Sequence, residues 1–94
     1  MKICIVPVCY NSYEDAIKLL DSIEIAFKKT VNVYLDVVLS DNSSSSCHFS
    51  DDYSYSFYYI KNDNIGYFPA FNKGLSVLKD DVSEYDFVIV KIFC

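Results

Sequence analysis

The chain has 94 residues, 52% of them hydrophobic and 17% aromatic, and this length suits a single domain, residues 1–94, with a small core. Eight basic and 13 acidic residues give a net charge of −5, which argues against nucleic acid and anionic lipid as partners. The longest apolar run near the N-terminus, Ile3 to Tyr10, is far shorter than the roughly 20 residues of a membrane-spanning helix, so we predict a cytoplasmic protein without a membrane span. A chain of this size cannot bury so many apolar side chains, and we expect exposed apolar surface.

The first elements follow a strand–helix pattern. Residues 2–9 form a continuous apolar run, which is typical of a parallel strand covered on both faces. Ser12 is placed to cap the following helix, and Asp15, three residues later, is placed to bond back to its backbone N–H. Apolar residues then recur at helical spacing, which predicts a helix over residues 13–29.

The rest of the chain repeats this alternation. Residues 31–39 and the aromatic-rich residues 53–60 predict two further strands, separated by a serine-rich loop at 43–52. Gly66 opens a second helix, and residues 87–90 predict a fourth strand.

These elements predict one α/β unit with a mostly parallel four-stranded sheet in the order 3-2-1-4. Ligands of such open sheets bind beyond the carboxyl ends of the strands. The loops expected at that edge are residues 10–12, 41–44 and 62–67.

Each of these loops carries a motif of one enzyme family. Residues 5–11 (IVPVCYN) resemble the "P-x-x-Y-N" opening of family-2-like glycosyltransferases, and residues 37–44 (VVLSDNSS) resemble their "V-D-N-x-S" turn. Residues 62–75 (NDNIGYFPAFNKGL) are similar to their "N-x-N-x-G-x-x-x-A-x-N-x-G" segment. Three motifs in the family's order and spacing cover nearly the whole chain.

The resemblance implies a three-layer α/β/α, Rossmann-like half-domain of the GT-A type. It also implies a nucleotide-diphosphate sugar as partner, UDP-, GDP- or dTDP-linked, for transfer to an acceptor in glycan or polysaccharide synthesis. In the family, the residue matching Asp41 accepts a hydrogen bond from the base, and the loop around Tyr10 lies along the nucleoside. The nucleotide-binding residues implied for this chain are Tyr10, Asn11, Asp41, Asn64, Gly66 and Asn72. Gly74, in the middle of a helix, is expected to allow tight helix-to-sheet packing.

The catalytic part of the family pattern is not found in this sequence. In relatives, the fourth strand leads into an acidic D-x-D motif that holds Mg²⁺ or Mn²⁺, whereas Lys91 and Ile92 follow it here. We interpret the acidic pairs at 51–52 and 80–81 as solvent-exposed surface residues and not as metal ligands. We therefore expect a chain truncated before this motif, with no catalytic residue, no metal site and no sugar transfer of its own.

Other interpretations remain at this stage. Asp41 also suits an Asx turn that stabilises the serine loop, and Tyr10 suits the rim of the core. A flavodoxin-like or receiver-like module is a second functional class, although a receiver needs an acidic pair where Tyr10 and Asn11 stand. A third is a non-catalytic remnant that forms a homo-oligomer through its exposed fourth strand.

The four cysteines show no pattern of a metal site or a disulfide framework. Cys4, Cys9, Cys47 and Cys94 include no CxxC pair and no zinc-site spacing, and His48 is the only histidine. We expect free thiols, and no histidine is placed to activate Cys9 as a nucleophile.

Overall fold

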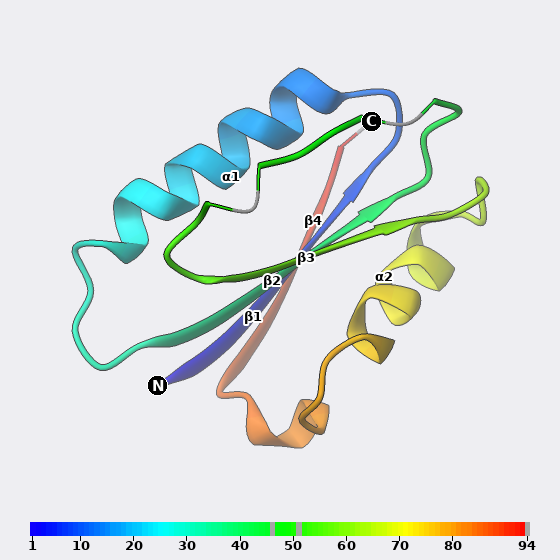
Figure 1. Cartoon of the computed structure of the whole chain (residues 1–94). Coiled ribbons are helices and arrows are strands. Elements are labelled where there is room, and N and C mark those ends of the chain that lie inside the picture. The colour runs from blue at the N-terminus through cyan, green and yellow to red at the C-terminus, as the bar shows by residue number, and fades with distance from the viewer. Residues whose placement is uncertain (46, 51, 94) are drawn as a thin grey trace.

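The structure is a computed structural model that describes residues 1–45, 47–50 and 52–93. All four strands are parallel, in the order β3-β2-β1-β4, with α1 on one face of the sheet and α2 on the other (Figure 1). The predicted α/β architecture and strand order are confirmed. The elements are β1 (Lys2–Cys9), α1 (Tyr13–Phe27), β2 (Tyr34–Asp41), β3 (Ser56–Lys61), α2 (Tyr67–Ser76), a 3-10 helix (Val82–Glu84) and β4 (Phe87–Ile92).

This strand order separates the fold from one of the alternative classes. β3 pairs with β2, and β1 lies between β2 and β4. A flavodoxin-like or receiver-like sheet has the order 2-1-3-4-5, in which the third strand lies beside the first. The strand order therefore differs from that of the flavodoxin-like and receiver-like folds.

Two strands begin later than the sequence predicts. β2 begins at Tyr34 because Asn32 adopts a left-handed backbone with φ of 60°, which interrupts an extended strand. Residues 53–55 precede β3 because their side chains pack along α1 instead. The rings of Tyr53 and Tyr55 stack with centroids 4.9 Å apart, and the Tyr55 hydroxyl donates to the Leu20 carbonyl at 2.9 Å.

The predicted cap of α1 is wrong. Ser12 precedes the helix, but its side chain makes no capping hydrogen bond. Its ψ of 52° is far from the extended backbone that usually directs a capping hydroxyl toward the first turn.

The core lies in two clusters on the two faces of the sheet. Cys9, Leu20 and Leu39 belong to the cluster under α1, and Val6 and Val38 belong to the cluster under α2. A Cβ atom on Gly74 would lie 2.7 Å from Val6 Cγ1, so α2 approaches the sheet more closely than any other residue would allow. The packing role predicted for this glycine is confirmed.

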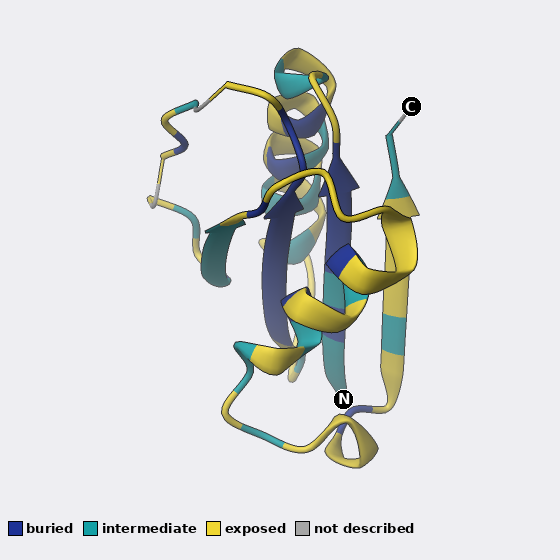
Figure 2. Cartoon of the chain, turned by 90° about the vertical axis from the view of Figure 1, so that its right-hand side faces the viewer, coloured by how far each residue is buried: buried dark blue, intermediate teal, exposed yellow. Residues whose placement is uncertain are grey.

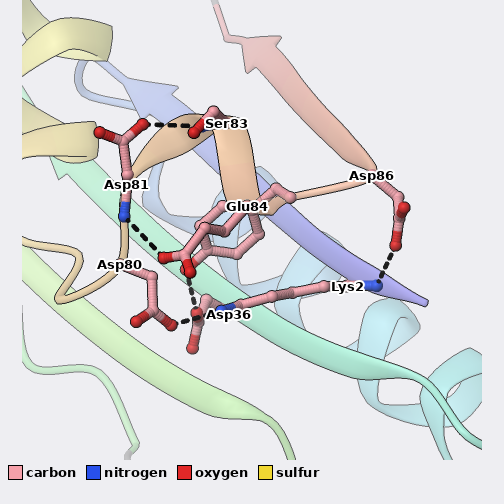
Figure 3. Close-up of polar contacts among 8 residues, drawn as sticks. Lys2, Asp36, Asp80, Asp81, Ser83, Glu84 and Asp86 are labelled. Carbon is pink, nitrogen blue, oxygen red and sulfur yellow. Dashed lines mark hydrogen bonds and ion pairs between the residues drawn. The ribbon is translucent and has the colours of Figure 1, made fainter.

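The acidic pair at 80–81 has structural partners near the amino ends of the strands. Asp80 forms an ion pair with the Lys2 ammonium, while the Lys2 backbone N–H donates to Asp86 at 2.7 Å (Figure 3). Asp81 and Glu84 form a capping box around the 3-10 helix. This cluster ties β1 to the segment that enters β4.

The two edge strands of the sheet differ in exposure, because β3 is half-buried along most of its length and β4 is largely exposed. The segment that precedes β3 is held on α1, where Tyr53 donates to Asp21 at 3.1 Å and the Ser54 backbone N–H donates to Glu24 at 2.6 Å. β4 is largely exposed beside the buried strands β1 and β2 (Figure 2). Phe87, with 54% of its surface exposed, confirms the expected exposed apolar surface. No helix in the described part of the chain is long and apolar enough to cross a membrane.

Candidate functional site

The three motif-bearing loops meet at the carboxyl edge of the sheet, at the upper right of Figure 1. The parallel register aligns Cys9 with Asp41, and Asp41 with Lys61. The loops that leave β1, β2 and β3 therefore start at the same level. The sequence motifs are brought together as the resemblance implies.

Asn11 joins the first loop to the second. Its backbone N–H donates to Ser43 Oγ at 2.7 Å, and its side-chain oxygen accepts from the N–H and hydroxyl of Ser44 at 3.1 and 3.2 Å. The φ of Asn11 is 52°, a left-handed conformation that asparagine tolerates better than most residues. Both its backbone and its side chain therefore order the serine loop.

Asn42 and Asn62 join the second loop to the third. Asn42 Nδ2 donates to the Gly66 carbonyl at 3.1 Å, and Asn62 Nδ2 donates to Ser40 Oγ at 2.8 Å and Asn42 Oδ1 at 3.2 Å. Both asparagines are buried. Both asparagines lie within the motifs but are not among the nucleotide-binding residues that the resemblance implies. Their role is to fix the relative positions of the loops.

Asp41 is fully buried, and its carboxylate points into the protein. Its Oδ1 accepts from the Ser43 backbone N–H at 2.9 Å, and its Oδ2 accepts from the hydroxyls of Tyr59 at 2.6 Å and Tyr13 at 3.2 Å. The bond to Ser43 is an Asx turn. In this conformation the Asp41 carboxylate is hydrogen-bonded within the protein and is not itself exposed to a ligand.

The hydrogen bonds also decide the protonation state of Asp41. Burial raises the pKa of the carboxyl, but the hydrogen bonds from Ser43, Tyr59 and Tyr13 outweigh this effect and lower the pKa below its usual value. The carboxylate is therefore ionised at neutral pH. Sequence patterns did not indicate the two tyrosines, because they lie 18 and 28 residues from Asp41.

The other predicted residues divide between the edge and the helix. Tyr10, 41% exposed, follows β1, and Asn64 and Gly66 are exposed in the loop before α2. Asn72 is exposed on α2, and no hydrogen bond joins it to the three loops among the residues that the structure describes. The accessible edge therefore comprises Tyr10, Asn11, Asn64 and Gly66, with Asp41 beneath it.

A polar hollow of about 490 Å³ lies at this edge, where the first loop enters α1. Its lining consists of residues 11–15, which include the carboxylates of Glu14 and Asp15. The volume is within the range of small-molecule sites. Carboxylates accept hydrogen bonds from hydroxyl groups and repel phosphates, so the hollow suits a ribose or sugar better than a diphosphate.

Gly66 is required at the edge for its backbone conformation. Its φ of 86° and ψ of 169° are accessible essentially only to glycine, although the space around it would admit a Cβ atom. We expect Gly66→Ala to lower the free energy of unfolding by about 1–3 kcal/mol, measured by urea denaturation. Asn64→Ala, in the same loop, should change it by less than about 0.5 kcal/mol. An equal effect of the two substitutions would contradict the backbone explanation.

No cluster of three or more His, Cys, Asp or Glu side chains in residues 1–45, 47–50 and 52–93 could hold a metal ion. Cys4, Cys9 and Cys47 are free thiols, as predicted, and Cys94 lies outside the described residues. Burial raises the pKa of Cys4 to about 11 and also raises that of Cys9, so both remain protonated at neutral pH.

Comparison with known proteins adds no relative: no family model, curated protein or solved structure matches this chain.

Proposed function

We propose that this chain binds the nucleoside diphosphate part of a nucleotide sugar at the carboxyl edge of its sheet. The observation that carries the proposal is the joining of the three motif-bearing loops into one polar edge. Asn11 bonds to Ser43 and Ser44, and Asn42 bonds to Gly66, so the loops form a continuous surface. A preformed surface loses little conformational entropy when a ligand binds.

The accessible side chains suit a nucleoside. The exposed ring of Tyr10 offers a flat apolar surface for a base, and its hydroxyl offers a hydrogen bond. Asn64 adds an amide donor and acceptor on the opposite loop. Asp41 contributes indirectly, because its inward hydrogen bonds hold the serine loop in place.

The charges at the edge suggest where a diphosphate would lie. Glu14 and Asp15 disfavour phosphate in the first turn of α1, whereas the first turn of α2 contains no acidic residue. Backbone N–H groups at a helix N-terminus attract anions. We therefore place the diphosphate toward Gly66 and the ribose toward Asn11.

The proposal concerns donor binding and assigns no catalytic step to this chain. Relatives of the glycosyltransferase family use Mg²⁺ or Mn²⁺, but the described residues do not include a suitable ligand set, so no step is assigned to a metal. Binding by the edge alone is expected to be independent of a divalent ion.

A thermal-shift titration with UDP, GDP and dTDP, with and without Mn²⁺, tests the proposal. We expect one nucleotide to raise the Tm by several degrees at concentrations far above its Kd, because about 2.7 kcal/mol of stabilisation is reached at 100 times Kd. Tyr10→Ala should weaken the binding about three- to tenfold through loss of the ring contact.

Tyr34→Ala is the matched control. Tyr34 is also an exposed tyrosine, but it lies at the start of β2, at the other end of the sheet. Its replacement should leave nucleotide binding unchanged. Absence of a shift with every nucleotide, or equal weakening by both substitutions, would refute binding at this edge.

A further inference from the structure

The outer edge of β4 has unpaired backbone groups. Among the described strands β4 pairs only with β1, and Asp86 N–H donates to the Lys2 carbonyl at 2.7 Å. Ile89 lies opposite Ile5, and Phe93 N–H donates to the Val8 carbonyl at 3.0 Å, so Ile89 bonds toward β1 and its neighbours Val88 and Val90 direct their N–H and C=O groups away from β1. Such an edge is a template for another strand.

The side chains of β4 do little to protect this edge. The strand reads FVIVKI, has no proline and carries one charge, on Lys91. Phe87, Ile89 and Val90 are 54%, 46% and 45% exposed. Natural edge strands are usually blocked by several charges, a proline, a bulge or a covering segment. The other edge strand, β3, is half-buried along most of its length, whereas β4 is largely exposed.

An apolar hollow adjoins the same edge. It has a volume of about 200 Å³ and lies between the last turns of α1 and the sheet, where Ile3, Ile5 and Ile89 line it together with Phe27. The α1 face of β1 and β4 is therefore incompletely covered. A strand added beside β4 would extend the apolar face toward this hollow.

The charges of β4 favour a second copy of the same strand in antiparallel orientation. Asp86 precedes the strand and Lys91 lies near its end, so antiparallel pairing brings the basic end of one copy beside the acidic end of the other. Parallel pairing would place Lys91 beside Lys91. Like charges side by side disfavour a sheet pair, and opposite charges favour it.

We infer that two copies of this chain associate through antiparallel pairing of their β4 strands. A two-fold axis at Ile89 places that residue opposite its own copy and Phe87 opposite Lys91, and residues that oppose each other then lie on the same face. The outward backbone groups of Val88 in one copy and Val90 in the other bond on either side of the axis. The result is a closed dimer with one continuous sheet, and it does not depend on nucleotide binding.

Sedimentation equilibrium of the 94-residue chain tests this inference over about 10–500 μM, the range expected for a small interface. We expect a monomer–dimer equilibrium that shifts toward dimer as salt is added, because each copy carries a charge of −5 and salt screens the repulsion. Ile89→Lys places two like charges opposite each other at the axis and should weaken dimerisation at least about tenfold.

Ile25→Lys is the matched control, because Ile25 is 61% exposed but lies on α1. It should dimerise like the wild type, and circular dichroism should show that both variants are folded. A wild type that is monomeric throughout the range would overturn the inference and leave the edge to a strand of a different protein. Dimers that persist in Ile89→Lys would overturn it as well.

Discussion

Asp41→Ala is expected to lower the free energy of unfolding by about 2–4 kcal/mol at neutral pH. The substitution removes a buried carboxylate and leaves the Ser43 N–H and the hydroxyls of Tyr59 and Tyr13 without their acceptor. Hydrogen bonds to a charged group contribute more than neutral ones, and a buried donor without an acceptor carries its own penalty. Urea denaturation at pH 7 measures the difference.

The effect should depend on pH in a defined direction. The pKa of Asp41 is lower in the folded protein than in the unfolded chain, so its ionisation stabilises the fold above the unfolded pKa near 4. This contribution decreases as pH falls below the unfolded pKa and is lost as pH passes through the folded pKa, so the difference between the two proteins should shrink below about pH 4. Asp63→Ala, at an exposed loop position, is the control. A deficit that stays constant over this range would contradict the role of the ionised carboxylate.

Gly74→Val is expected to lower the free energy of unfolding by about 2–3 kcal/mol. A Cβ atom at this position would lie 2.7 Å from Val6 Cγ1 and 3.6 Å from Val38 Cγ1. Both valines are buried on central strands, and β-branched side chains have few alternative rotamers. Valine favours a helix slightly more than glycine does, and this gain is too small to offset the overlap.

Two further variants separate packing from helix propensity. Asn72→Val introduces the same side chain at an exposed position of α2 and should cost less than about 0.5 kcal/mol. Val6→Ala removes the nearest obstructing methyl groups, so the double variant should be more stable than the sum of the two single effects predicts. Strictly additive effects would show that the close approach of α2 is not the cause.

Much of the fold could be predicted because its signals are local. The uninterrupted apolar run of β1 and the helical spacing of α1 are each contained in one segment of the sequence. The misplaced start of β3 shows the limit of such signals. Tyr53 and Tyr55 have the composition of a strand, but the partners of their hydroxyls lie on α1, about 30 residues earlier.

The candidate site was predictable in location but not in detail. Motifs at the ends of successive parallel strands are brought together by the topology alone, and this placed the three loops correctly. The orientation of Asp41 depends on Tyr13 and Tyr59, which no pattern near Asp41 reveals. Asn72 belongs to the third motif but lies on the exposed surface of α2, and no hydrogen bond joins it to the described residues of the three loops.

The most direct test of nucleotide binding at this edge is a titration followed by ¹H–¹⁵N correlation spectra, with each amide as a separate probe. Binding at the carboxyl edge predicts concentration-dependent shifts for Asn11, Ser44, Asn64 and Gly66 with one of UDP, GDP or dTDP, and no shifts at the start of β2 or along β4. Unchanged spectra at millimolar nucleotide, or shifts confined to the apolar hollow beneath α1, would contradict it.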